Sequence, residues 1–161
     1  MQDELRGRDG FTWEAPLQAA RFCLTNKIHL DQGKKWVEQS IINQENSANL
    51  FTLAKYQSAE GKTTEAAGTT EKAKNLATEA ELNAYGYALL AEKNITEAID
   101  IFALNVKKHP ESWNVYDSLG EGLDLNKNKK EALKNYRIAL SKAPEGQKSR
   151  IEKIITTLQS Q

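Results

Sequence analysis

The stretch SLGEGLDLNKNKKEALKNY, residues 118–136, decides between two kinds of fold. Its glycines Gly120 and Gly122 are compatible with a phosphate-binding loop, and equally with a helix that packs closely against another helix. A G-x-G-x-x-G loop needs a third glycine where Leu125 stands, and it needs a preceding strand, whereas WNVYDS (113–118) continues a helical pattern. The sequence therefore favours two packed helices.

The two glycines are expected to differ. A glycine inside a helix costs about 1 kcal/mol relative to alanine, so a close neighbour must offset that cost. We expect Gly120 to face Ala132 and Ala139 of the following helix. Nothing in the pattern requires glycine at position 122, so Gly122→Ala is predicted to be neutral or mildly stabilising.

An internal repeat of 34 residues runs through the second half of the chain. A period of this length is typical of arrays of helix pairs. The matched pairs are Gly86 and Gly120, Leu89 and Leu123, Ala98 and Ala132, Phe102 and Tyr136, and Pro110 and Pro144.

The first half follows the same order more loosely. Ala66 and Gly33 precede Ala98 at intervals of 32 and then 33 residues, which gives two further units. In the first unit either Ala20 or Arg21 occupies the small-residue position of the first helix. We favour Ala20, because this choice buries Cys23 rather than an arginine.

Each unit is expected to form two helices. In the last unit we predict helices over 113–125 and 129–141, joined by the turn NKN (126–128). Ser112 and Thr96 are placed as the first residues of helices, because both are good capping residues. The tail carries apolar residues at i, i+3, i+4 and i+7, which predicts a capping helix over the open end of the array. These are Ile151, Ile154, Ile155 and Leu158.

These positions resemble the tetratricopeptide repeat (TPR). The last unit matches its pattern at Tyr116, Leu119, Gly120, Leu123, Ala132, Tyr136, Ala139 and Pro144. The third unit departs from it clearly at Asn105, and the first two units match weakly, since Thr70 replaces the aromatic residue and neither has the proline. The resemblance implies an all-α, right-handed superhelical array of about four helix pairs over 14–144. Residues 145–161 would then be the capping helix and tail, and residues 1–13 a linker or N-terminal extension.

A second, narrower resemblance concerns residues 11–41, FTWEAPLQAARFCLTNKIHLDQGKKWVEQSI. They are similar to the C-terminal helical region of a bacterial family of unknown function, in which an N-terminal β domain often precedes such helices. This resemblance implies that the chain is part of a larger protein, and that the larger protein is exported.

Composition excludes several classes of function. Lys+Arg and Asp+Glu are 22 each, so the basic excess of a general nucleic-acid binder is absent. No apolar run approaches the length of a membrane span, and the first ten residues lack the apolar region of a signal peptide. The two histidines, His29 and His109, have no second ligand at metal spacing, and no Ser/His/Asp arrangement is present. We therefore expect no enzyme activity, no cofactor and no metal, and we interpret both histidines as surface residues.

In the TPR family the first helix of each unit lines the inner surface, where partners bind. Mapping by offset gives a predicted groove, aromatic at first and acidic towards its C-terminal end, with Phe22 or Arg21 contributed by the first unit. Its residues are Phe51, Lys55, Asn83, Tyr87, Asp117, Glu121 and Asp124. A solvated helix face is the alternative for the three carboxylates. An acidic groove favours basic or neutral partners, unlike the basic grooves that hold a partner's C-terminal carboxylate.

The resemblance thus implies a non-enzymatic scaffold that binds a peptide or protein segment in its groove. The alternative is a structural appendage that stabilises or orients a neighbouring domain of a larger protein.

Overall fold

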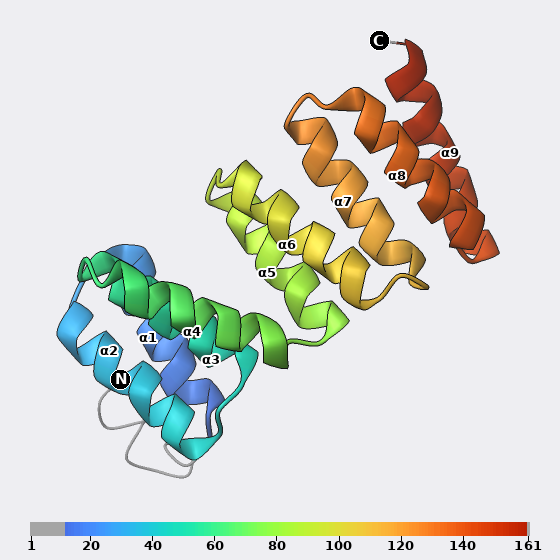
Figure 1. Cartoon of the computed structure of the whole chain (residues 1–161). Coiled ribbons are helices and arrows are strands. Elements are labelled where there is room, and N and C mark those ends of the chain that lie inside the picture. Colours follow the sequence, from blue (N-terminus) through green and yellow to red (C-terminus); the bar gives the residue numbers. More distant parts are fainter. Residues whose placement is uncertain (1–11, 161) are drawn as a thin grey trace. The chain divides into compact units, whose positions relative to one another are not determined.

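The computed structural model describes residues 12–160. Within this range the chain forms nine α-helices and no strand, so the predicted all-α repeat array is confirmed (Figure 1). The helices are α1 (Glu14–Asn26), α2 (Leu30–Asn43), α3 (Ser47–Ala59), α4 (Thr63–Leu76), α5 (Glu79–Ala91), α6 (Ile95–Lys108), α7 (Trp113–Leu125), α8 (Lys129–Lys142) and α9 (Glu145–Ser160). No helix of the described part is both long and apolar enough to cross a membrane.

The helices group into two compact units. Unit 1 ends at Ala77 and holds α1 to α4, and unit 2 runs from Thr78 and holds α5 to α9. Within each unit, consecutive helices pack as hairpins. The boundary therefore falls between the second and third repeats, inside the region 14–144 for which the sequence predicts one repeat domain.

The same turn closes every hairpin. In the last one, the Asn128 N–H donates to the Leu123 carbonyl at 2.9 Å, and Lys127 adopts a left-handed conformation with φ 63°. This arrangement satisfies the free carbonyls at the end of a helix. Lys27 and Lys93 hold the same place in two other hairpins, and Gly61 holds it in the remaining one. The repeat thus extends to the turns, and the predicted turn over 126–128 is confirmed.

Small residues lie at the predicted crossing points of both helices in every hairpin. At these positions the buried small residues of the first helices are Ala20, Ala54, Gly86 and Gly120. In the second helices they are Gly33, Ala66, Ala98 and Ala132. Ala20 and Cys23 are buried while Arg21 is exposed, so the choice of Ala20 in the first unit is confirmed.

Aromatic rings of the second helices explain the glycines of unit 2. A Cβ on Gly86 would lie 2.3 Å from Cε1 of Phe102, and a Cβ on Gly120 would lie 3.1 Å from the ring of Tyr136. The sequence suggested that Gly120 faces Ala132 and Ala139. In the structure its nearest neighbour is the ring of Tyr136, for which it makes room.

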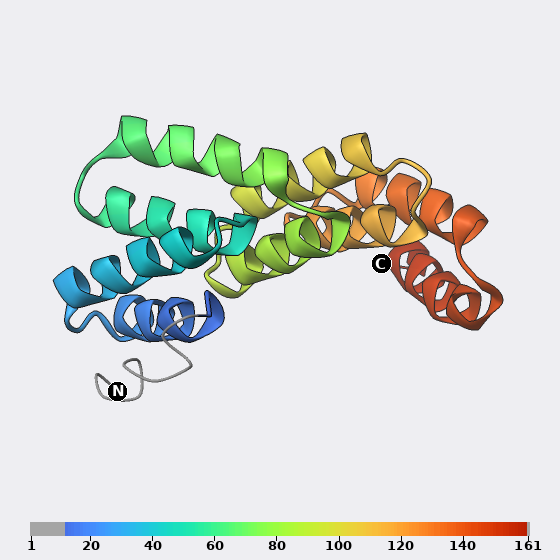
Figure 2. The same ribbon diagram turned by 90° about the horizontal axis from the view of Figure 1, so that it is seen from below.

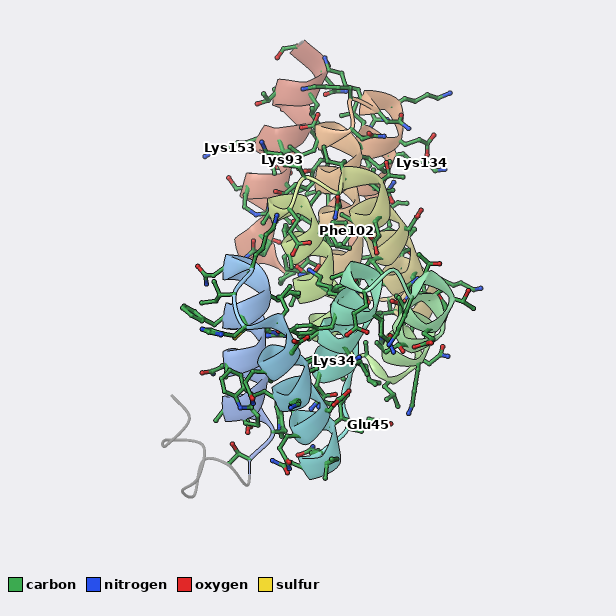
Figure 3. All side chains as sticks on the ribbon, turned by 90° about the vertical axis from the view of Figure 1, so that its left-hand side faces the viewer. Lys34, Glu45, Lys93, Phe102, Lys134 and Lys153 are labelled. Atoms are coloured by element: carbon green, nitrogen blue, oxygen red, sulfur yellow. The ribbon has the colours of Figure 1, made fainter. Side chains whose placement is uncertain are left out.

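Gly122 also has close neighbours, which the sequence did not suggest. A Cβ on Gly122 would lie 3.2 Å from Cδ2 of Phe102 and 3.3 Å from Cγ1 of Ile99, closer than ordinary van der Waals contact. Both neighbours come from α6, the second helix of the preceding repeat. Phe102 has no exposed surface and lies among the helices of unit 2 (Figure 3). Its ring thus fills the space left by two glycines, one on α5 and one on α7.

One predicted helix start and one predicted cap differ from the structure. α6 begins at Ile95 with Asn94 as its N-cap residue, so Thr96 lies inside the helix. Ser112 is the N-cap residue of α7 as expected, but its hydroxyl does not cap the helix. It donates instead to Glu79 Oε1 at 2.8 Å and so connects α7 to the start of α5.

The last helix, α9, covers the end of the array. It lies beside α8 (Figure 2) and buries Ile151, Ile155 and Leu158 in one cluster with Ala132 and Tyr136 of α8. The predicted capping helix is therefore present.

Two glycine substitutions test this packing. Gly86→Ala should lower the free energy of unfolding by about 1–3 kcal/mol, because the added methyl displaces the fully buried Phe102 ring. Gly68→Ala is the matched control, since it lies inside α4 with no atom within 4 Å of the new Cβ. It should stabilise the chain by up to about 1 kcal/mol. Chemical denaturation of both variants measures the difference, and equal effects would contradict the packing account.

Candidate functional site

The predicted groove residues divide between the two units. Phe51 and Lys55 lie on α3 in unit 1. Five residues lie in unit 2, on the two first helices α5 and α7: Asn83, Tyr87, Asp117, Glu121 and Asp124. We call this second set, together with Ser118, the α5–α7 face.

Tyr87 connects the two helices of this face. Its hydroxyl donates a hydrogen bond to Glu121 Oε2 at 2.8 Å and lies 3.4 Å from Ser118 Oγ. Its ring packs edge-on against Phe102, with centroids 5.3 Å apart. Burial is the main cause that raises the pKa of Tyr87 to about 12. The contact with Ser118 lowers this pKa, while the hydrogen bond to Glu121 and the charges of Glu121 and Asp117 raise it. The phenol is therefore protonated at neutral pH and remains a donor.

Asp117 binds the last helix. It is 8% exposed, and its Oδ2 accepts a hydrogen bond from Nη2 of Arg150 on α9 at 2.9 Å. The guanidinium of Arg150 also lies 6.0 Å from the centre of the Trp113 ring. The other oxygen, Oδ1 of Asp117, is buried and has no hydrogen-bond partner among the described residues. A buried carboxylate oxygen without a partner is uncommon, because it loses its hydration without compensation.

The carboxylates of α7 also affect Tyr136 on α8. Tyr136 is 4% exposed, and burial raises its pKa, with further increases from the charges of Asp117, Glu121 and Asp124. The α5–α7 face thus combines three carboxylates of α7 with the phenol of Tyr87, and the buried phenol of Tyr136 on α8 lies within the influence of the same charges.

Unit 1 has a related contact at the corresponding repeat positions. Arg21 Nε donates to Thr52 Oγ1 at 3.2 Å, which joins α1 to α3 across 31 residues. The contact between Tyr87 and Ser118 spans the same 31 residues. Each is formed by two consecutive first helices, but in unit 1 the bridging residue is cationic.

The two groove residues predicted in unit 1 differ in accessibility. Phe51 is only 4% exposed, so its ring is not presented to solvent. Lys55 is half-buried. Asn83 in unit 2 is half-buried as well, and its Oδ1 is buried without a hydrogen-bond partner in the described structure.

Two residues of the site were missed in the sequence. Ser118 carries no signal of its own, since alanine stands 34 residues before it. Arg150 lies 33 residues after Asp117 and could have been found by treating the tail helix as one more first helix.

The remaining candidate groups give no further chemistry. His109 is half-buried, and its Nε2 is inaccessible and has no hydrogen-bond partner among the described residues, whereas His29 is exposed as expected. Within residues 12–160 no three His, Cys, Asp or Glu side chains are grouped so that they could hold a metal ion.

Several solved structures share this arrangement of helices. YrrB, described as a TPR protein with an unusual peptide-binding site, is 18% identical over 90% of this chain and 76% of its own, with a TM-score of 0.51. Residues 41 to the end of MamA from Desulfovibrio magneticus RS-1 are 13% identical over 91% of this chain and 82% of theirs, with a TM-score of 0.52. A MamA RS-1 double mutant gives the same identity and coverage, with a TM-score of 0.53.

The chain has the tetratricopeptide-repeat fold. At these identities the likeness concerns the fold alone. No protein-family model and no curated protein matches the chain. The resemblance of residues 11–41 to a bacterial family therefore stays a prediction, and its first residue, Phe11, lies outside the described residues.

The hydrogen bond from Tyr87 is testable through stability. Tyr87→Phe should lower the free energy of unfolding by about 1 kcal/mol, because it removes a half-buried donor from the Glu121 carboxylate. Tyr116→Phe is the matched control, since its half-buried hydroxyl makes no hydrogen bond to any described residue. Urea denaturation compares the two, and an equal loss in both variants would show that the contact does not stabilise unit 2.

Proposed function

We propose that this TPR array is a non-enzymatic interaction scaffold that binds a segment of a partner protein on the α5–α7 face. The observation that carries the proposal is the connected polar and aromatic network of Tyr87, Ser118 and Glu121, which spans two consecutive first helices. Tyrosine is enriched where proteins form their strongest contacts. The network offers both an apolar ring and charged acceptors.

Unused hydrogen-bonding groups support the same proposal. Asp124 is half-buried, yet its carboxylate makes no ion pair or hydrogen bond with the described residues. The second carboxylate oxygen of Glu121 likewise has no partner there. The related fold of YrrB, which is described as having a peptide-binding site, is consistent with this use of the array.

The test is a peptide-library screen followed by mapping of the bound peptides. Binding should be weakened about tenfold or more in a double variant, Tyr87→Phe with Glu121→Gln, because the loss of well-placed polar contacts costs at least that much. Glu152→Gln is the control. This substitution also removes one negative charge, but from an exposed position of α9 that is not part of the α5–α7 face. Nuclear magnetic resonance shifts of the bound protein should concentrate on α5 and α7.

Two results would contradict the proposal. One is that the double variant binds the selected peptides as tightly as the unchanged chain does. The other is a shift map confined to unit 1. Thermal melts of the variants separate a loss of binding from a loss of fold.

A second candidate function is that the array stabilises or orients a neighbouring domain. Three exposed apolar side chains lie close together in the sequence: Phe22 on α1, Ile28 in the turn after it and Leu30 at the start of α2. Exposed apolar side chains that gather on a surface are typical of contact sites. If a neighbouring domain packs on these side chains, replacing Phe22 and Ile28 by serine should lower the Tm of a longer protein that contains that domain. The Tm of this chain alone should stay unchanged. Equal effects on both would count against the appendage.

A further inference from the structure

The carboxylates of the α5–α7 face are not neutralised by the groups around them. Three carboxylates, Asp117, Glu121 and Asp124, line α7, and one guanidinium, that of Arg150, is paired with them. Glu121 uses Oε2 for the bond from Tyr87, and its other oxygen has no partner among the described residues. Two negative charges of this cluster therefore lack a cation.

Arg150 shows which chemistry this place accepts. Its guanidinium binds a carboxylate through Nη2 and lies over the face of Trp113. A planar cation with several N–H donors suits both contacts, because guanidinium pairs with carboxylates and stacks on aromatic rings better than an ammonium group does. The ring of Tyr87 adds a second aromatic group beside the carboxylates.

Arg150 itself is only loosely held. Its side chain is 44% exposed, and Nη2 makes the single contact to Asp117. Its Nε donates to Gln147 Oε1 of the same helix at 3.2 Å. Only the Arg150 end of this ion pair is exposed, whereas Asp117 is buried. A competing guanidinium that keeps Asp117 paired can therefore displace Arg150 without leaving a buried charge uncompensated.

The buried oxygen of Asp117 determines the direction of approach. Oδ1 has almost no solvent contact, so an incoming cation reaches this carboxylate from the Oδ2 side, where Arg150 lies. An external cation and Arg150 therefore compete for the same atom.

We infer that the α5–α7 face binds an arginine side chain of the partner segment, and that Arg150 of α9 is its intramolecular competitor. This inference rests on the proposed function and states the chemistry of the partner. The partner's guanidinium takes the place of Arg150 on Asp117 and extends towards the free oxygens of Glu121 and Asp124. The departing Arg150 moves into solvent.

The test uses two pools of short peptides with randomised flanks, one with a fixed central arginine and one with citrulline in its place. Citrulline keeps the shape of arginine and lacks the charge. The arginine pool should bind about tenfold more tightly, and Asp117→Asn should abolish most of that difference. The preference should also weaken at high salt.

The decisive variant is Arg150→Met, with Lys153→Met as its matched control. Both remove one positive charge from an exposed position of α9, but Lys153 has no contact with the carboxylates and extends outward in Figure 3. If Arg150 competes, only Arg150→Met should tighten binding of the arginine pool, by about two- to fivefold, because the peptide no longer has to displace Arg150 from Asp117. Binding of the citrulline pool should stay unchanged in both variants.

The outcomes separate this inference from the proposed function. Peptides that bind on the α5–α7 face without preferring arginine, or an equal response of the Arg150 and Lys153 variants, would overturn the inference and leave the scaffold function in place. Absence of binding by either pool, together with no peptide recovered from the library screen, would overturn both.

Discussion

The ring of Phe102 is the contact on which unit 2 depends. It comes from α6, has no exposed surface, and meets Gly86 of α5 with one edge and Gly122 of α7 with the other. Because a Cβ at either glycine would press against the ring, the spacing of three helices depends on two residues that lack a side chain. One aromatic side chain thus positions both first helices of the unit.

The candidate site inherits its geometry from this packing. The ring of Tyr87, next to Gly86 in the sequence, rests against Phe102, and this contact directs its hydroxyl towards Ser118 and Glu121 on α7. The acidic residues lie on α7, and the contact of Gly122 with Phe102 positions that helix. α9 then completes the arrangement, because its apolar side packs on α8 while Arg150 binds Asp117. The core and the surface of unit 2 are therefore connected through the side chains of Phe102, Tyr87 and Arg150.

The repeat pattern was readable in the sequence because it depends on residue size at fixed spacing. The limits of α7, the turn after it and the capping role of α9 all follow from local patterns of apolar residues and turns. The close neighbour of Gly122 was not foreseen because Phe102 belongs to the preceding repeat, and a comparison of equivalent positions does not reveal contacts between repeats.

The candidate site was predictable only in part, for the same reason. The offset that placed Tyr87 and Glu121 on neighbouring first helices is a property of the repeat, and the structure joins them by a hydrogen bond. The ion pair of Arg150 depends on the side-chain reach of a helix outside the repeat, and the burial of Phe51 depends on its neighbours in space. Neither is encoded in the spacing.

The central claim is that the two glycines are required by the Phe102 ring, and a double-mutant cycle tests it most directly. Free energies of unfolding would be measured for Gly122→Ala in the unchanged chain and in a Phe102→Leu background. The account predicts that alanine is unfavourable beside the phenylalanine ring, and that it becomes favourable by up to about 1 kcal/mol beside the smaller leucine, where its helix propensity prevails. The same effect of Gly122→Ala in both backgrounds would contradict it.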